Sequence, residues 1–254
     1  MSNHIDQMLT KGFRFDKRQF DEFREVVIEK GATPNAEGSA RVLIGETEVI
    51  AGVKMSVERP YPDTPENGNI AVNVELLPLS NPRFEPGPPQ IQAVELARVV
   101  DRGIRESGVI DTKKLCITKG EKVWMIFIDI CSINDAGNLR DAAALAAIAS
   151  LQDARFPTYN EDGIDYKHKT DEKIPLDGLP IEVTVIKIGD HFIIDPTLEE
   201  EAVLEKRLTV ATLEDGRICA LQKGGDGALT SEDIEFMLTK ATEKCQELRA
   251  KLED

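Results

Sequence analysis

The sequence predicts an α+β fold made of two βαβ-type halves, with mixed sheets and helices packed on them. Residues 49–57 and 70–77 alternate apolar and polar side chains, which is typical of half-buried strands. A continuous apolar run at 123–133 indicates a buried central strand. Helical patterns alternate with the strands at 90–107, 138–153 and 231–252.

The N-terminal part of the chain is expected to form a helical turn at 16–23, followed by strands. The strands are predicted at 24–29, 40–44, 48–57 and 70–77. Gly45 lies at the turn between the second and third strands. Two proline-rich segments, 59–68 and 78–89, flank the fourth strand and must be loops.

The central part begins with the clearest helix, at 90–107. Gly108 is expected to end this helix, because glycine readily adopts the left-handed conformation found after helices. The apolar strand at 123–133 follows, and then an alanine-rich helix at 138–153 whose small side chains would let it lie close against a sheet. Residues 154–179 are polar and interrupted by prolines, so we place a domain boundary there.

The C-terminal part repeats this logic with two hairpins and a closing helix. Gly189-Asp190 is a two-residue turn between strands at 181–188 and 191–194. A second hairpin, formed by 207–213 and 217–221, turns at Asp215-Gly216. The helix at 231–252 has Thr230 as its expected N-cap and acidic residues in its first turn.

Length and patterning together suggest how the chain is divided. The 254 residues allow one large domain or two modest ones. We expect an N-terminal extension at 1–30, a first domain at 31–165 and a second domain at 180–254.

Composition excludes several classes of protein. With 31 Lys and Arg against 46 Asp and Glu, the net charge of −15 argues against a broad basic face for nucleic acid. The four cysteines show no C-x-x-C spacing and no flanking histidine, which disfavours a zinc site or a redox pair. No signal peptide is visible, and the longest apolar stretch, at 142–151, is too short to span a bilayer. We therefore expect a soluble, cytoplasmic protein.

Several motifs spread along the chain carry a resemblance to a known family. They are Arg14-Phe15-Asp16-x-Arg18, Asp21-Glu22-x-Arg24, Gly38-Ser39-Ala40-Arg41-Val42, Gly45-x-Thr47-x-Val49-x-Ala51-x-Val53, the segment 95–105, Asp135-Ala136-Gly137-Asn138 and Asp195-Pro196-Thr197-x-Glu199-Glu200. Together they resemble the RNase PH family over nearly the whole chain, although Lys17 stands where that family usually has glycine. Within the family, the chain most resembles the non-catalytic RNase PH-like subunits of the archaeal exosome.

The resemblance implies an RNase PH-like fold and a defined set of partners. It implies a hexameric ring of three heterodimers, in which a catalytic RNase PH-like subunit degrades RNA from the 3′ end by phosphate attack. This chain would shape the active site of that partner and help to bind single-stranded RNA. RNA-binding cap subunits would sit on the ring, and neither a membrane nor a cofactor of this chain's own is implied.

Two residues stand where active members of the family carry an acidic pair, and they are Glu201 and Arg207. An arginine cannot replace the second acid, because its guanidinium stays protonated and repels a divalent cation. We therefore predict no catalytic residue and no metal site in this chain. Glu199, Glu200, Glu201 and Glu205 are interpreted as a solvated acidic segment, with a magnesium site as the alternative.

The family's phosphate pocket also departs from its pattern here. The family places an arginine in a turn at a helix N-terminus, where backbone N–H groups meet an anion. Leu139 occupies that arginine position, Arg140 lies one residue later, and Asp141 would weaken it. A second family arginine aligns with Gln92. Phosphate binding by this chain is therefore not expected.

A basic stripe remains as the candidate RNA-binding site. Arg98, Arg102 and Arg105 are spaced i, i+4 and i+7, which places them on one helix face that suits the phosphates of a single strand. The alternative is a salt-bridged surface, because Glu95 precedes Arg98 by three residues and Asp101 precedes Arg105 by four. The resemblance favours RNA binding.

Arg59, in the first proline-rich loop, is a weaker candidate for RNA binding than the stripe. Two other features have simpler interpretations. Gly224-Gly225-Asp226-Gly227 lacks the lysine of a P-loop and is read as a flexible turn. Trp124 lies inside an apolar strand and is read as a core residue.

Two alternative functions remain open from the sequence. The chain could itself be an active phosphate-dependent 3′–5′ exoribonuclease, which the Glu201 and Arg207 pair disfavours. It could instead be an unrelated βαβ protein that binds a small molecule in an apolar pocket. The net charge does not exclude RNA work, since a ring needs positive charge only along its channel.

Overall fold

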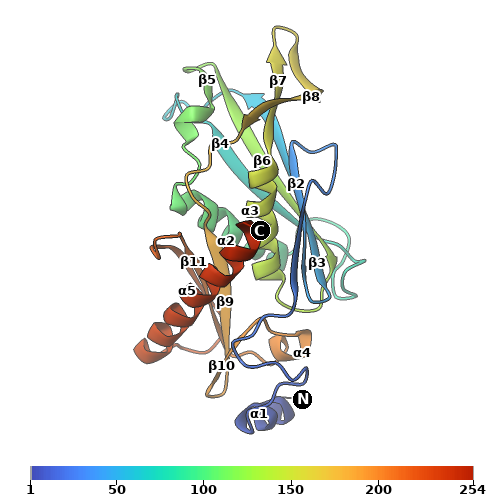
Figure 1. The fold of residues 1–254 in the computed structure, drawn as a ribbon, viewed down its shortest axis with the longest axis vertical. Coiled ribbons are helices and arrows are strands. Elements are labelled where there is room, and N and C mark those ends of the chain that lie inside the picture. Colours follow the sequence, from blue (N-terminus) through green and yellow to red (C-terminus); the bar gives the residue numbers. More distant parts are fainter. Residues whose placement is uncertain (1, 254) are drawn as a thin grey trace.

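A computed structural model describes residues 2–253, and its largest element is a six-stranded sheet (Figure 1). The path runs through β1 (Val26–Lys30), β2 (Gly38–Ile44), β3 (Thr47–Glu58), β6 (Lys122–Asn134) and β4 (Asn69–Leu76), with the short β5 (Cys116–Thr118) also on β6. The β4–β6 pair is parallel and the other pairs are antiparallel. The sheet is therefore mixed, as predicted.

The second half contains a four-stranded antiparallel sheet. Its order is β10 (His191–Ile194), β9 (Ile181–Ile188), β11 (Lys206–Thr212) and β12 (Ile218–Gly224). The long helix α5 (Ser231–Glu253) packs on β9 and β11. Thr230 caps α5 as expected: its hydroxyl accepts from the Asp233 N–H at 3.1 Å, and the Asp233 carboxylate accepts from the Thr230 N–H.

The alanine-rich helix α3 (Leu139–Asp153) joins the two halves. It contacts β2 and β3 of the first sheet and β9 of the second, and every residue from 141 to 151 is buried. A helix covered all round needs small apolar side chains on all of its faces, which explains its composition. Gly38 in β2 allows the close approach, because a Cβ at this position would overlap the Ala154 backbone.

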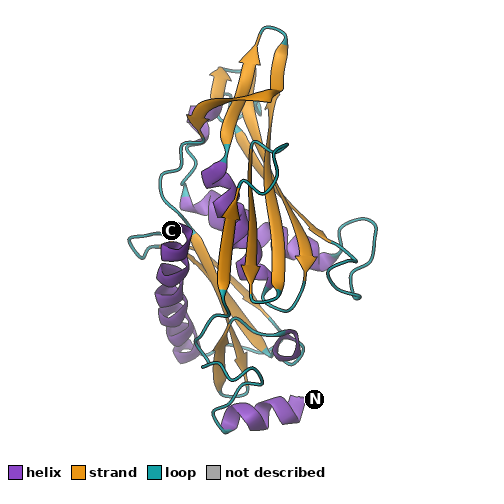
Figure 2. Cartoon of the chain, turned by 45° about the vertical axis from the view of Figure 1, so that its right-hand side comes forward, coloured by secondary structure: helices purple, strands orange, loops and turns teal. Residues whose placement is uncertain are grey.

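Helix α2 (Ile91–Ser107) lies beside β4 and also reaches β9, β11 and β12 of the second sheet. Gln90 is its N-cap, and Gly108 ends it in the left-handed conformation at φ 68°, as predicted. In Figure 2, helices lie behind the long strands of the first sheet, on one of its faces. Trp124 is 9% exposed and packs near Phe156, so the core interpretation is confirmed.

Several elements differ from the expectation. Residues 16–23 contain turns and no helix, whereas the helix α1 (Ser2–Thr10) was not predicted. The 154–179 segment contains a hairpin of β7 (Arg155–Asn160) and β8 (Gly163–Lys173), which projects at the top of Figure 1. The remaining short helices are η1 (Thr112–Leu115) and α4 (Leu198–Glu201).

Long-range contacts explain these differences. In α1, Ile5 and Leu9 are buried against Ile186, Ile188 and Ile193 of the second sheet, a surface that local patterning does not reveal. The strand β1 falls within the extension expected at 1–30 and forms the edge of the first sheet. Within residues 2–253, no helix is long and apolar enough to cross a membrane.

Candidate functional site

The arginine face of α2, which consists of Arg98, Arg102 and Arg105, is exposed along the helix. Arg102 donates to the Gln222 side chain at 3.2 Å, which ties the middle of the face to β12. Arg105 donates to the Ile70 carbonyl at 2.7 Å and pairs with Asp101 at 2.8 Å. Among the described residues, no hydrogen bond or ion pair engages the Arg98 side chain.

The alternative predicted for this face was a salt-bridged surface, and one of its two expected ion pairs forms. The Asp101–Arg105 pair forms, and Asp101 is the largest cause of a raised pKa of Arg105. The Glu95–Arg98 pair does not form, because Glu95 turns toward other arginines. Arg59 is exposed in the loop after β3.

A separate cavity of about 220 Å³ brings together the five positions that the sequence resemblance assigns to the acidic pair and the phosphate pocket. Gln92 comes from α2, Leu139 and Arg140 from the start of α3, Glu201 from α4 and Arg207 from β11. We call this cavity the arginine pocket. The sequence analysis already singled out all five residues, although the first and the last lie more than a hundred positions apart in the chain.

The sequence did not reveal two further features of the arginine pocket. Arg83, from the proline-rich loop after β4, is exposed and lines it. Glu95 bridges two of the arginines that line it: one carboxylate oxygen pairs with Arg140 at 3.4 Å, and the other pairs with Arg207. Neither contact follows a helical spacing, so no local signal could have revealed it.

The acidic segment around α4 is not uniformly solvated, which corrects the sequence interpretation. Glu200 is 1% exposed and pairs with Arg14 at 2.7 Å. Glu201 is half-buried, burial raises its pKa, and its carboxylate accepts from the Asn138 N–H at 3.0 Å. Glu199 and Glu205 are exposed, as expected.

A magnesium ion does not fit the donor set of the arginine pocket. Arg140 and Arg207 place two fixed positive charges around Glu201, and both oppose a divalent cation. Within residues 2–253, no group of three or more His, Cys, Asp or Glu side chains is arranged to hold a metal ion.

The turn before α3 also differs from the expectation in one respect. Asp141 does not face Arg140: its carboxylate is fully buried and accepts from the Thr184 N–H at 2.9 Å and from Asn138 at 3.2 Å. Burial raises the pKa of Asp141 to about 7. The anion that neutralises Arg140 is therefore Glu95 and not Asp141.

Several motifs that carry the family resemblance meet in a network of ion pairs and hydrogen bonds next to the turn that precedes α3. Asp195 is fully buried and accepts from Arg18 at 2.8 Å, from three N–H groups of Arg24 at 2.7–2.8 Å, and from the Asn138 amide at 2.9 Å. Arg24 also donates to the Ala136 and Gly137 carbonyls. These motif residues hold the N-terminal segment, the turn and the second half together.

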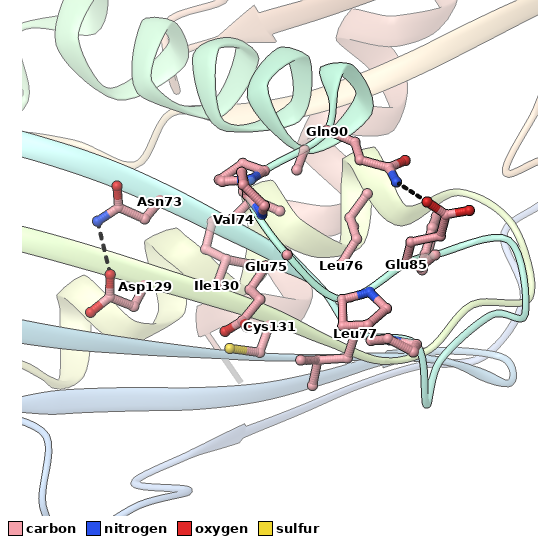
Figure 3. Close-up of a pocket in the computed structure, with 17 residues that line it drawn as sticks. Asn73, Val74, Glu75, Leu76, Leu77, Glu85, Gln90, Asp129, Ile130 and Cys131 are labelled. Atoms are coloured by element: carbon pink, nitrogen blue, oxygen red, sulfur yellow. Dashed lines mark hydrogen bonds between the residues drawn. The ribbon is translucent and has the colours of Figure 1, made fainter.

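A second cavity, larger than the arginine pocket, has the wrong charge for RNA. It measures about 770 Å³ and lies between the edge strand β4 and the proline-rich loop that follows it (Figure 3). Within its lining, Asn73 donates to Asp129 and Gln90 donates to Glu85. Its lining includes the carboxylates of Glu75, Glu85 and Asp129 and no lysine or arginine. RNA phosphates would be repelled there.

Comparison with known proteins places both halves in one family. The model of the 3′ exoribonuclease family, domain 1, matches residues 22–157, and the model of its domain 2 matches residues 178–244. A protein of Methanocella arvoryzae named exosome complex component Rrp42 is 48% identical over 251 residues, covering 99% of this chain and 95% of that protein. The protein of the same name from Thermoplasma acidophilum is 47% identical, covering 98% and 94%.

Solved structures agree with this placement. A chain of the Archaeoglobus fulgidus exosome with RNA bound to the active site is 44% identical, with a TM-score of 0.92 over 98% of this chain and 96% of that chain. A chain of an archaeal exosome core is 40% identical, with a TM-score of 0.88 over 100% and 96%. The predicted α+β fold is confirmed, and the interpretation as an unrelated small-molecule binder is wrong. The chain belongs to the RNase PH family of 3′ exoribonucleases.

Proposed function

We propose that this chain is the non-catalytic RNase PH-like subunit of an archaeal exosome. The composition of the arginine pocket carries the proposal. Where active members of the family have a second acid, Arg207 pairs with Glu95, and the remaining acid, Glu201, is half-buried between two guanidiniums. Such a pocket holds neither a paired-carboxylate metal site nor a free cationic site for phosphate.

The role left to this subunit is to pair with the catalytic RNase PH-like subunit in the hexameric ring and help to hold RNA. The relatives named as exosome components support this assembly. In the same proposal, RNA-binding cap subunits sit on the ring, and the complex works in the cytoplasm. The two domains would extend over 31–165 and 180–254, with β1 of the N-terminal extension pairing at the edge of the first sheet.

The arginine face is the proposed RNA contact of this chain, and Arg98 is its strongest member. Arg98 is exposed and has no internal partner among the described residues, so its whole charge is available to a phosphate. Arg102 and Arg105 would contact RNA with the N–H groups that Gln222, Asp101 and Ile70 do not use. Arg59 is a further proposed contact.

RNA affinity of the assembled ring tests this contact. Arg98→Glu, Arg102→Glu and Arg105→Glu are each compared with the intact ring over a range of salt concentrations. Each lost phosphate contact should lower the magnitude of the salt slope by about 0.7 for a single strand. Arg217→Glu is the matched control, since Arg217 is 75% exposed on a hairpin of the second sheet. Unchanged affinity and slope in all three variants would contradict the RNA-binding role.

A phosphorolysis assay tests the absence of catalysis. The purified chain alone, given RNA and inorganic phosphate, should release no nucleoside diphosphates, whereas the assembled ring should release them. Release by the lone chain at a rate comparable with that of the ring would establish the alternative, an active exoribonuclease.

A further inference from the structure

Glu95 lies at an unusual junction of three elements. It projects from α2, and its two carboxylate oxygens pair separately with Arg140 of α3 and Arg207 of β11. One carboxylate between two guanidiniums is the arrangement by which arginines hold a phosphate group, because each oxygen faces a separate donor.

The two arginines need an anion between them. Arg140 is 20% exposed and Arg207 is 13% exposed, so water screens their repulsion only in part. Burial lowers the pKa of Arg207, and the neighbouring charge of Arg140 lowers it further, whereas Glu95 raises it. Without Glu95, the two guanidiniums would lose the carboxylate that both of them contact.

The charges of the whole pocket balance only because of this carboxylate. Its lining carries the cations of Arg83, Arg140 and Arg207 and the acids Asp135 and Glu201. The Asp135 carboxylate accepts from the Asn81 amide at 2.7 Å and from the Gly137 N–H at 3.0 Å. These hydrogen bonds hold Asp135 against the turn that precedes α3. Glu95 cancels the remaining positive charge, and an incoming anion meets no net attraction.

We infer that Glu95 is an internal counter-anion that occupies an oxyanion site formed by Arg140 and Arg207, and thereby closes the pocket to inorganic phosphate. The site itself is intact, since a carboxylate already contacts both arginines with one oxygen each. Neutralising Glu95 opens it. This inference goes beyond the proposed RNA contact, which lies on the arginine face and does not depend on it.

Binding of inorganic phosphate to the full chain, measured by isothermal titration calorimetry at constant ionic strength, tests the inference. The unmodified chain should show no saturable binding. Glu95→Gln keeps the shape of the side chain and removes its charge. It should bind phosphate saturably, with a Kd at least tenfold below the highest phosphate concentration at which the unmodified chain shows no saturation. Glu106→Gln is the matched control, since Glu106 is exposed on the same helix, and it should behave like the unmodified chain.

A double variant and a measurement on the unmodified chain complete the test. Glu95→Gln combined with Arg207→Gln should lose the gained affinity, because one of the two cations is gone. The melting temperature of the unmodified chain should rise no more in phosphate than in chloride of equal ionic strength, and this measurement does not depend on the folding of any variant. Saturable phosphate binding by the unmodified chain, or equal binding by a folded Glu95→Gln chain and the unmodified chain, would overturn the inference.

Discussion

Replacing Asp195 with asparagine should destabilise the protein strongly, and the structure gives the scale of the loss. Asp195 has φ 49°, a left-handed conformation that asparagine adopts as readily as aspartate, so the substitution leaves the backbone unstrained. The NH₂ group of asparagine would stand where a carboxylate oxygen of Asp195 accepts hydrogen bonds, and it would face the N–H donors of the neighbouring side chains. One carboxylate oxygen accepts from Arg18 and from two N–H groups of Arg24, and the other accepts from Arg24 and Asn138.

The size of the effect follows from the burial of the partners. The side chains of Arg18 and Arg24 are 9% and 14% exposed. The substitution leaves the largely buried Arg24 without its counter-ion, and it leaves Arg18 with only its pair to Asp16 at 2.7 Å. Breaking a buried pair in this way costs about 3–5 kcal/mol of unfolding free energy. Asp215→Asn removes a pair with Arg217 at the surface, where the carboxylate is 52% exposed and solvent screens the charges, so it should cost far less than Asp195→Asn.

Urea unfolding measures both variants. The single tryptophan, Trp124, is 9% exposed and reports the loss of the first sheet by its fluorescence, while far-UV circular dichroism follows the whole chain. Coincident transitions by the two probes justify the free energies. The reasoning would be refuted if Asp195→Asn lost no more than Asp215→Asn.

Three further predictions concern other buried groups. Burial raises the pKa of Glu182 to about 8, above its value near 4.5 when unfolded, so the folded state holds the proton and the unfolding free energy should fall as the pH rises between these values. Urea titrations at pH 5 and pH 9 measure the difference in unfolding free energy between the two pH values. In Glu182→Gln this difference should be smaller by at least about 1 kcal/mol, since one pKa unit corresponds to about 1.4 kcal/mol. An equal difference in the variant and the unmodified chain would contradict the raised pKa of Glu182. Gly137→Ala should lower the melting temperature more than Gly216→Ala, because both glycines have positive φ but only a Cβ at Gly137 would overlap the Pro196 carbonyl; equal shifts would refute the close contact. Burial raises the pKa of the Cys245 thiol to about 12, so iodoacetamide should label it only after unfolding, and labelling of the native chain, mapped by mass spectrometry, would count against this.

The predicted elements with strong local signals match the structure closely. Alternation with period two marked the strand observed at Thr47–Glu58, and Gly108 marked the end of α2. Thr230 at the start of α5 was identified by its capping chemistry. These signals depend on neighbours within a few residues, so the chain carries them before it folds.

Elements whose stability comes from distant contacts were missed. The hairpin of β7 and β8 occupies a polar segment whose pairing no alternation of apolar residues reveals. Glu200 belongs to a run of acids that resembles a solvated surface, yet Arg14 reaches it from the other end of the chain. The side chain of Glu95 had the spacing for Arg98 but pairs with Arg140 and Arg207.

The sequence by itself determined the elements with strong local signals, the family and the spacing of the arginine face. It also determined that Arg207 replaces an acid, because the identity of a residue is independent of how the chain folds. Only the tertiary structure decided which charges neutralise one another. Ion pairs between α2, α3 and β11 depend on distances that no local pattern encodes, and through them Glu95 engages Arg140 and Arg207 instead of Arg98.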